Sequence, residues 1–502
     1  MEKKQLISLP EGKDFIQFLN DVENEVTPGT CTIEAFNYWP IIRFAINGRR
    51  AGKKLKGEGI LPAVTKLKLK KLWLKKILRL NRRPKPTYAK SYFDHLQKAD
   101  VLFLNRDTQY NSNLPGYSIQ FFTDGLRHVA GEEVTCATMV NRDPRKAAER
   151  FWVDTVVMPK PKSAYGAKLL NPSGFPELSV RDSVIAKIAE VNSVIKKLGI
   201  DHHVNERYIL QRIDRTVALV HYFDLLLRHV QPKVIYLSSF TGAYHICVAA
   251  RQLGIQVVDI QHGGMHENHP LAANWTRVPA SGYALLPDVF WCWEERTATY
   301  VSSTFSTCHK AIVGGNTRAA FEKIVFKNSA EVSLVSLKRP SVLVALQYGK
   351  SALVAPHVQE AYRATKYKVD WRFRLHPRGF DRLDEAANLL ELSREDILSA
   401  SERPLHQIFP DTTLLLTDAS TIVYEALDQG VRPAVWSQKG GAFFDDLLEA
   451  GHLSFVATVE DVVDFVMADV EISASRKKQP TKEQDMSELV TIKTHFDALL
   501  SG

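Results

Sequence analysis

Short runs of apolar residues alternate with helical patterns from residue 99 onward, and each run ends in polar residues. In the clearest unit, residues 233–264, apolar positions predict a strand at Val234–Leu237, a helix that ends at Gln252, and a strand at 257–260. Gly254 is well placed to stop the helix. A strand, a helix and a strand at this spacing predict parallel strands in one sheet.

A second series of the same kind begins near Ala311. A chain of 502 residues is too long for one ordinary core, so two such series predict two Rossmann-like α/β domains, divided between residues 300 and 340. The predicted strands of the second series lie at 342–346, 371–375, 412–416 and 432–436. The predicted divisions are a helical, basic extension at 1–90, a first domain at 91–305, a second domain at 306–475 and a C-terminal helix at 476–502.

The composition, 45% hydrophobic and 24% charged, is that of a globular protein. Five cysteines are scattered without metal-ligand spacing, which predicts reduced thiols and no metal site. No apolar stretch reaches the length of a membrane span, and no long apolar region follows the N-terminal lysines. We therefore expect no signal peptide and a protein that stays in the cytosol.

The net charge of +9 is concentrated in residues 53–85, which hold thirteen Lys or Arg and one acid, Glu58. Leu72, Trp73 and Ile77 recur there at helical spacing among lysines, which predicts a cationic amphipathic helix. Such a helix can lie in an anionic membrane interface, pack on its own domain, or bind nucleic acid. We prefer the membrane surface and expect no nucleic-acid partner, because the charge is confined to one helix.

The loop after the predicted strand at 371–375 carries His376 and Pro377 between Arg374 and Arg378. Proline holds the preceding residue in an extended conformation, which fixes the imidazole at the strand end. The two arginines offer planar donors for phosphate oxygens. This loop is a candidate nucleotide-phosphate site, and the alternative is a surface loop with incidental charge.

A second candidate loop runs from Asp418 to Thr421 and leads into a predicted helix. Hydroxyl groups and free backbone N–H groups at a helix start favour an anion. The alternative is an ordinary helix cap made by Ser420. Glu425, one turn further along, could accept a hydrogen bond from a ribose hydroxyl or could be a surface acid. Gln347, which follows the strand at 342–346, joins the expected donor-binding residues.

The first series offers two candidates for catalysis. His262 stands at a predicted strand end, and the glycines that follow it allow close approach of a ligand, although a structural turn would need the same residues. Asp124, before Gly125, is a candidate general base for a sugar hydroxyl, and Asp107 is its rival. Asp-Gly is also a common turn sequence.

Asp124-Gly125, His376-Pro377 and Ser420-Thr421 occur in the order found in bacterial GT-B glycosyltransferases that use CMP-activated acidic sugars, and the chain resembles these sialyltransferases and Kdo transferases. Thr123 stands where that family has a further acid. The unit that ends in Gln261-His262-Gly263 looks like that of surface-polysaccharide transferases. The run 405–409, followed by 417–420 and 425–427, is similar to a broader set that includes teichoic-acid glycerolphosphotransferases and nucleotide-sugar epimerases.

The resemblance implies a GT-B fold, in which two Rossmann-like domains face a central cleft, and a metal-independent glycosyltransferase without a cofactor. The donor would be CMP-linked Kdo or a sialic-acid-like sugar, and the acceptor a lipid-linked polysaccharide or lipopolysaccharide. His376, Ser420 and Thr421 would bind the donor phosphate. Asp124 would take the acceptor proton in an inverting mechanism, and a carboxylate of the first domain would be the nucleophile in a retaining one.

The residues expected to bind the donor are Gln347, Arg374, His376, Pro377, Arg378, Asp418, Ser420, Thr421 and Glu425, and those expected in catalysis are Asp124, His262 and His376. With the basic segment 53–85 at the lipid surface, the enzyme would be peripheral on the cytoplasmic face of the inner membrane. A UDP-sugar or glycerol-phosphate transferase of the same fold, or a non-catalytic membrane-tethered scaffold, are the alternatives.

Overall fold

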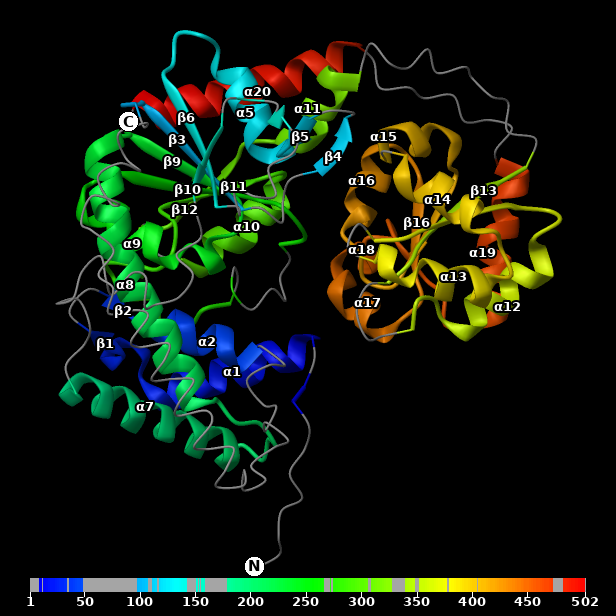
Figure 1. The fold of residues 1–502 in the computed structure, drawn as a ribbon. Coiled ribbons are helices and arrows are strands. Elements are labelled where there is room, and N and C mark those ends of the chain that lie inside the picture. Colours follow the sequence, from blue (N-terminus) through cyan, green and yellow to red (C-terminus); the bar gives the residue numbers. More distant parts are fainter. Residues whose placement is uncertain are drawn as a thin grey trace, which may run out of the picture.

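A computed structural model shows two α/β domains side by side (Figure 1). The residues that the structure describes are 9–10, 12–33, 36–47, 97–106, 111–114, 117–141, 150–151, 153, 155–158, 178–265, 271, 274–305, 308–326, 339–347, 352–376, 379–403, 405–472 and 482–501. The predicted basic helix at 53–85 and the rival base Asp107 lie outside this part of the chain.

The first domain is built on a seven-stranded parallel sheet in the order β12-β11-β10-β9-β3-β6-β8. Its strands are β3 (Val101–Arg106), β6 (Cys136–Asn141), β8 (Thr155–Met158), β9 (Val234–Leu237), β10 (Gln256–Ile260), β11 (Val289–Cys292) and β12 (Lys310–Val313). All four residues of β9 are buried, which explains its continuous apolar run. Val234 and Tyr236 face one core, whereas Ile235 and Leu237 face the other.

Helices cover both faces of this sheet. One face is covered by α8 (Glu206–Val230), α9 (Tyr244–Gln252) and α10 (Glu295–Thr304). Helices α1 (Gly12–Val26), α2 (Trp39–Asn47) and α7 (Leu178–Lys197) extend the same core further out, where α2 and α7 pack on α8 and α7 packs on α1 (Figure 1). The other face packs against α5 (Phe121–Ala130), α11 (Thr317–Phe326) and α20 (Lys482–Ser501). Small elements complete this part of the chain: β1 (Thr32–Ile33), β2 (Phe36–Asn37), β4 (Asn111–Leu114), β5 (Tyr117–Ile119), β7 (Arg150–Phe151), η1 (Pro28–Thr30) and η4 (Phe240–Gly242).

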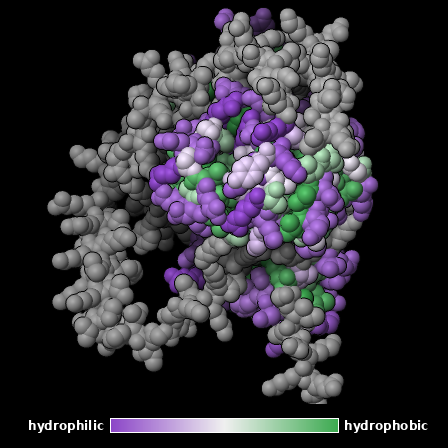
Figure 2. All heavy atoms as spheres, turned by 90° about the vertical axis from the view of Figure 1, so that its right-hand side faces the viewer, coloured by the Kyte–Doolittle hydropathy of each residue, from purple (hydrophilic) through white to green (hydrophobic). Residues whose placement is uncertain are grey.

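The second domain has a five-stranded parallel sheet in the order β14-β13-β15-β16-β17. Its strands are β13 (Ser341–Ala345), β14 (Asp370–Arg374), β15 (Leu414–Thr417), β16 (Arg432–Val435) and β17 (Ser454–Phe455). One face packs against α12 (Pro356–Thr365), α13 (Leu383–Leu390), α14 (Arg394–Glu402) and α19 (Val459–Ile472). The other packs against α15 (Leu405–Ile408), α16 (Ile422–Asp428) and α18 (Asp445–Glu449), and the remaining elements are α17 (Gln438–Phe443), η5 (Phe380–Arg382) and η6 (Phe409–Asp411). The outer face of this domain mixes polar and apolar residues (Figure 2).

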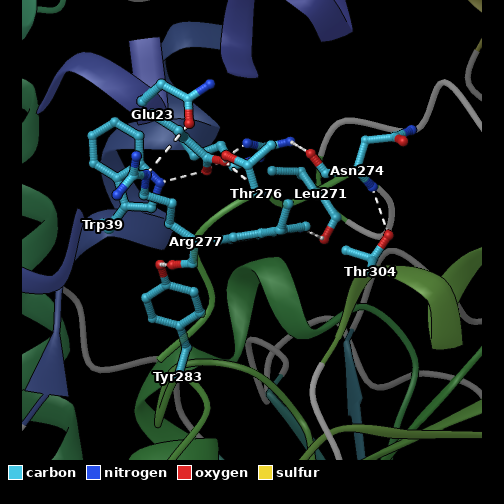
Figure 3. Close-up of polar contacts among 11 residues, drawn as sticks. Glu23, Trp39, Leu271, Asn274, Thr276, Arg277, Tyr283 and Thr304 are labelled. Carbon is cyan, nitrogen blue, oxygen red and sulfur yellow. Dashed lines mark hydrogen bonds and ion pairs between the residues drawn. The ribbon is translucent and has the colours of Figure 1, made fainter. Parts of the chain in front are cut away.

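A buried polar cluster attaches α1 and α2 to the first domain (Figure 3). Glu23 on α1 pairs with Arg43 on α2 at 2.5 Å and accepts a hydrogen bond from Trp39 Nε1 at 2.7 Å. Its second oxygen accepts from the backbone N–H and the hydroxyl of Thr276, at 2.9 and 2.8 Å. Arg43 donates to the carbonyl of Asn274 at 3.1 Å. Because both charges are below 2% exposed, losing one partner would leave the other buried without compensation.

The predicted fold class, two facing Rossmann-like α/β domains of GT-B type, is confirmed by the two parallel sheets. The divisions differ from the predicted ones. Strand β12 pairs with β11 and helix α11 packs on α5, so the first domain continues past residue 305. Helices α1 and α2, from the predicted extension, share the core of the first domain. The final helix is present as α20, and it packs on the first domain (Figure 1).

Candidate functional site

The loops at the carboxyl ends of the two sheets meet where the domains touch. Strand β10 ends at Ile260, and the glycines of the following loop lie against residues at the start of α16 and in α17. A Cβ at Gly264 would lie 3.4 Å from Thr421 Cγ2 and 2.9 Å from Phe443 Cε1. A side chain at Gly264 would therefore displace the ring of Phe443, so the glycine lets the two loops approach closely.

Two ion pairs and one ring contact also join the domains. Arg318 on α11 lies 3.0 Å from Glu425 on α16, and Arg296 on α10 pairs with Asp446 on α18. The ring of Trp293 meets the ring of Tyr424 edge to face, with centroids 6.4 Å apart. These contacts place α10, α11 and the His262 loop of the first domain against α16 to α18 of the second.

Asp124 lies in the first turn of α5 and is buried, with 1% of its surface exposed. Its carboxylate accepts a hydrogen bond from the backbone N–H of Gln120 at 2.9 Å. Burial raises the pKa of Asp124 to about 7, although that hydrogen bond and the charge of Arg127 act in the opposite direction. The carboxyl group therefore titrates near neutral pH, in the range that suits a general base.

A chain of buried side chains fixes the start of α5. Gln120 caps the helix by accepting from the backbone N–H groups of Phe122 and Thr123, at 2.7 and 3.1 Å. Its amide also donates to Ser238 Oγ, at the end of β9, at 3.0 Å. Thr123 donates to Asn105 Oδ1 on β3 at 3.0 Å. The position where the resembling family has a further acid thus holds a hydroxyl that binds the neighbouring strand.

Gly125 allows α5 and α11 to approach each other closely. A Cβ at this position would lie 2.8 Å from the carbonyl oxygen of Thr317 and 3.0 Å from Phe321 Cβ. The Asp124-Gly125 pair lies inside helix α5 and does not form the turn that is common for an Asp-Gly sequence.

His262 is exposed at the end of β10. Its ring lies edge to face with that of Phe122 on α5, with centroids 6.4 Å apart. Gln261 fixes the backbone on both sides, because its amide donates to the carbonyl of Gly263 at 3.0 Å and accepts from Trp293 N at 2.8 Å. The structure thus brings the His262 loop, the start of α5 and Thr421 together.

The candidates of the second domain stand at the carboxyl ends of adjacent strands. Gln347 follows β13, His376 follows β14 and Asp418 follows β15. His376 is exposed, and its carbonyl accepts from Gly379 N at 2.7 Å, which closes the loop. Pro377 and Arg378 lie outside the described residues. The exposed side chain of His376 therefore stands at the same sheet edge as Gln347 and Asp418.

Arg374 and Asp418 have structural contacts within the second domain. Arg374 Nη1 donates to the carbonyls of Ala400 and Arg403, at 2.5 and 2.6 Å, and so ties β14 to the end of α14. Asp418 accepts a hydrogen bond from Ser437 Oγ. A phosphate contact by Arg374 would compete with its bonds to two carbonyls.

Ser420 and Thr421 are partly exposed just before α16. Thr421 is the cap residue, and its side chain makes no capping hydrogen bond. Ser420 Oγ accepts a hydrogen bond from Ile422 N at the long distance of 3.5 Å. Both hydroxyls thus stand at the start of α16, at the carboxyl edge of the sheet.

Among the described residues, no group of three or more His, Cys, Asp or Glu side chains is placed to hold a metal ion. None of the described helices is long and apolar enough to cross a membrane.

Sequence patterns gave no indication of Arg318, Trp293 or Phe443 as site residues. Each becomes part of the site only through contacts across the domain boundary, which local spacing does not encode. A pair of glycines after β12, Gly314 and Gly315, was the sole local signal near Arg318.

No protein-family model matches the sequence, and no curated protein matches it. Among solved structures, S. aureus MnaA in a co-structure with UDP is 11% identical, with a TM-score of 0.44, and the match covers 79% of this chain and 91% of that chain. A UDP-GlcNAc 2-epimerase from Neisseria meningitidis bound to UDP-GlcNAc is 11% identical, with a TM-score of 0.44 and coverage of 80% and 100%. The wall teichoic acid polymerase TagF is 10% identical, with a TM-score of 0.41 and coverage of 87% and 99%. At these values the fold assignment rests on this chain's own sheet topology.

Proposed function

We propose that the protein is a glycosyltransferase whose second domain binds a nucleotide-sugar donor and whose first domain binds the acceptor. The observation that supports this function is the meeting of Thr421 with Gly263 and Gly264, because it joins the carboxyl edges of both sheets. In open α/β sheets ligands bind beyond the carboxyl ends of the strands, and domain interfaces are common sites for small molecules.

In this proposal the donor phosphate lies among His376, Ser420 and Thr421. The exposed imidazole and the two hydroxyls offer hydrogen-bond donors to charge that develops on the departing nucleotide. This electrostatic role needs no divalent cation, so we propose metal-independent transfer. Arg374 would act by fixing β14 and the His376 loop, since its guanidinium binds backbone carbonyls.

We assign proton acceptance from the acceptor to His262 in the first place, because it is exposed at the domain contact. Asp124, with 1% of its surface exposed, would need α5 to move before it could reach a substrate. Its raised pKa keeps it as the second candidate for the base.

The order of the Asp124-Gly125, His376-Pro377 and Ser420-Thr421 motifs supports a CMP-linked acidic sugar as the donor. A UDP-sugar would use the same fold. We also propose a lipid-linked glycan acceptor, as the resemblance to surface-polysaccharide transferases implies. The basic composition of residues 53–85 supports attachment to the cytoplasmic membrane face.

The test is calorimetric titration of the full chain with CMP, CDP, UMP and UDP. We expect CMP to bind most tightly and the His376→Ala variant to bind at least tenfold more weakly, because a hydrogen bond to a charged phosphate is lost. His452→Ala is the matched control, since His452 is exposed in the same domain but precedes β17 and so lies at the opposite sheet edge.

Tighter binding of UDP than of CMP would indicate a UDP-sugar as the donor and would leave the proposed transferase activity standing. No binding of any nucleotide would overturn the proposed function and favour the scaffold alternative.

A further inference from the structure

Arg318 is a cation of the first domain that reaches the donor side of the site. Its Nη1 lies 3.0 Å from Glu425 Oε1, and the two side chains are 28% and 20% exposed. Glu425 follows Thr421 by four residues, so the two share one face of α16 a single turn apart. Because Arg318 pairs with Glu425, it lies beside α16, and the hydroxyls proposed to bind phosphate stand at the start of that helix.

The backbone that carries Arg318 is held firmly. Asn316 caps α11 by accepting from Ala319 N at 3.1 Å. The carbonyl of Gly315 accepts from Trp291 Nε1 at 3.0 Å, and a Cβ at Gly314 would lie 1.9 Å from the Trp291 ring. Substitution at Gly314 is therefore excluded without movement of a buried tryptophan. The start of α11 is fixed on the sheet, and only the side chain of Arg318 needs to move to change its partner.

The surroundings of Arg318 suit an anion that arrives from the second domain. Its guanidinium lies over the ring of Phe121, 5.7 Å from the centroid, so one face is covered by an apolar group. A guanidinium presents several N–H donors in a plane and binds carboxylate and phosphate oxygens with the same geometry. A phosphate can therefore take the place of the Glu425 carboxylate, so that Arg318 keeps an anionic partner.

We propose that Arg318 binds the phosphate of the donor nucleotide across the domain boundary, and that Glu425 occupies Arg318 while the nucleotide is absent. This inference rests on the proposed function. When the nucleotide binds, the Glu425 carboxylate is released from Arg318 and can accept a hydrogen bond from a ribose hydroxyl. The internal ion pair thus keeps the arginine oriented for the phosphate that displaces its partner.

The consequence is that the nucleotide would be bound by both domains at once. Donor phosphate would contact Ser420 and Thr421 from one side and Arg318 from the other. A nucleoside, which lacks the phosphate, would gain nothing from Arg318. This difference separates phosphate binding from a purely structural role in holding the domains together.

The test compares a nucleotide with its nucleoside, CMP with cytidine, or UMP or UDP with uridine if the wild type prefers uridine. Calorimetry on the full chain gives the ratio of the nucleoside Kd to the nucleotide Kd. We expect this ratio to fall about tenfold in Arg318→Gln, and by less in Arg318→Lys, which keeps the charge without the planar fork. Thermal unfolding of each variant checks that it is folded.

Arg296→Gln is the matched control, because it removes the other ion pair between the domains, with Asp446. Its ratio should stay within about twofold of the wild type if Arg318 acts on phosphate. In Glu425→Gln, which frees Arg318, the ratio should be unchanged or higher. The same fall in Arg296→Gln or in Glu425→Gln as in Arg318→Gln would overturn the inference, since it would show a role of domain pairing alone.

An Arg318→Gln variant with the wild-type ratio would also overturn the inference while leaving the proposed function intact. A wild type that binds no nucleotide would instead overturn the proposed function, and this inference with it.

Discussion

The buried carboxylates of Glu23 and Asp124 have different surroundings and different effects on the protein. Glu23 is compensated by Arg43, Trp39 and Thr276. Asp124 accepts a hydrogen bond from the backbone N–H of Gln120, and burial raises its pKa to about 7. A carboxylate that is fixed by ion pairing serves structure, whereas one that titrates near neutral pH can exchange a proton.

The raised pKa of Asp124 makes the stability of the fold depend on pH. An unfolded aspartate loses its proton near pH 4, so between about pH 4 and 7 the folded protein holds a proton that the unfolded chain has lost. The free energy of unfolding should therefore fall as pH rises through this window, by roughly 4 kcal/mol in total for a shift of about three units.

Asp124→Asn removes this proton-linked contribution. We expect the stability of the variant relative to the wild type to increase between pH 5 and pH 8, measured by urea unfolding at both values. Asp201→Asn, at an exposed aspartate, should show a constant difference. A constant difference for Asp124→Asn as well would contradict the raised pKa.

At the scale of elements, local pattern predicts what lies within one turn or one strand. The strand Val234–Leu237, the helix end at Gln252 and the helix Ile422–Asp428 are observed at or next to their predicted bounds, because burial on both faces produces continuous apolar runs. The sequence assigned strand β12 to the second domain, because its apolar residues resemble those of strands in either sheet. Its pairing with β11 shows that it belongs to the first domain.

The contacts of site residues are less predictable than the elements that carry them. Arg374 looks like a phosphate ligand beside His376, but its Nη1 donates to two carbonyls at the end of α14, more than twenty residues away. Glu425 meets Arg318 more than one hundred residues distant. The sequence indicates which side chains lie at a sheet edge. It does not indicate their hydrogen-bond or ion-pair partners on other elements, because these depend on how the elements pack.

The packing of α17 on the Asp418 loop gives a prediction at this scale. A Cβ at Gly440 would lie 1.8 Å from the carbonyl oxygen of Asp418, so Gly440→Ala must move the loop that leads to Ser420 and Thr421. We expect a loss of about 1–3 kcal/mol in the free energy of unfolding and weaker nucleotide binding, measured by urea unfolding and calorimetry.

Gly441→Ala is the control, because its Cβ would meet neighbours only at ordinary contact distances of 3.6 Å or more. It should leave both measurements nearly unchanged. Equal effects of the two substitutions would assign the loss to the helix itself and not to the Asp418 loop.

At the scale of the whole molecule, the chain leaves the first domain after α11 and returns to it in α20 (Figure 1). Phe496 of α20 is fully buried and stacks on Tyr236 of β9, with ring centroids 5.5 Å apart. The last helix thus completes the core on one face of the first sheet. The second domain is an insertion between two parts of the first.

Phe496→Ala should destabilise the first domain by about 3–5 kcal/mol through the cavity that it leaves. Hydrogen exchange monitored by mass spectrometry should show lower protection in β9 and unchanged protection in β15. Val490→Ala, at a position on α20 that is 60% exposed, should change neither. Equal loss of protection in β9 and β15 would mean that the two domains unfold as one unit.

The return of the chain in α20 has a consequence for synthesis on the ribosome. Every strand and helix of the second domain emerges before Ile492 and Phe496, which close the core of the first. The domain that begins first in the sequence is therefore the last to be completed, and its exposed apolar sheet face must wait while its neighbour is translated. During that interval the ring of Tyr236 lacks Phe496, the residue that stacks on it in the folded protein.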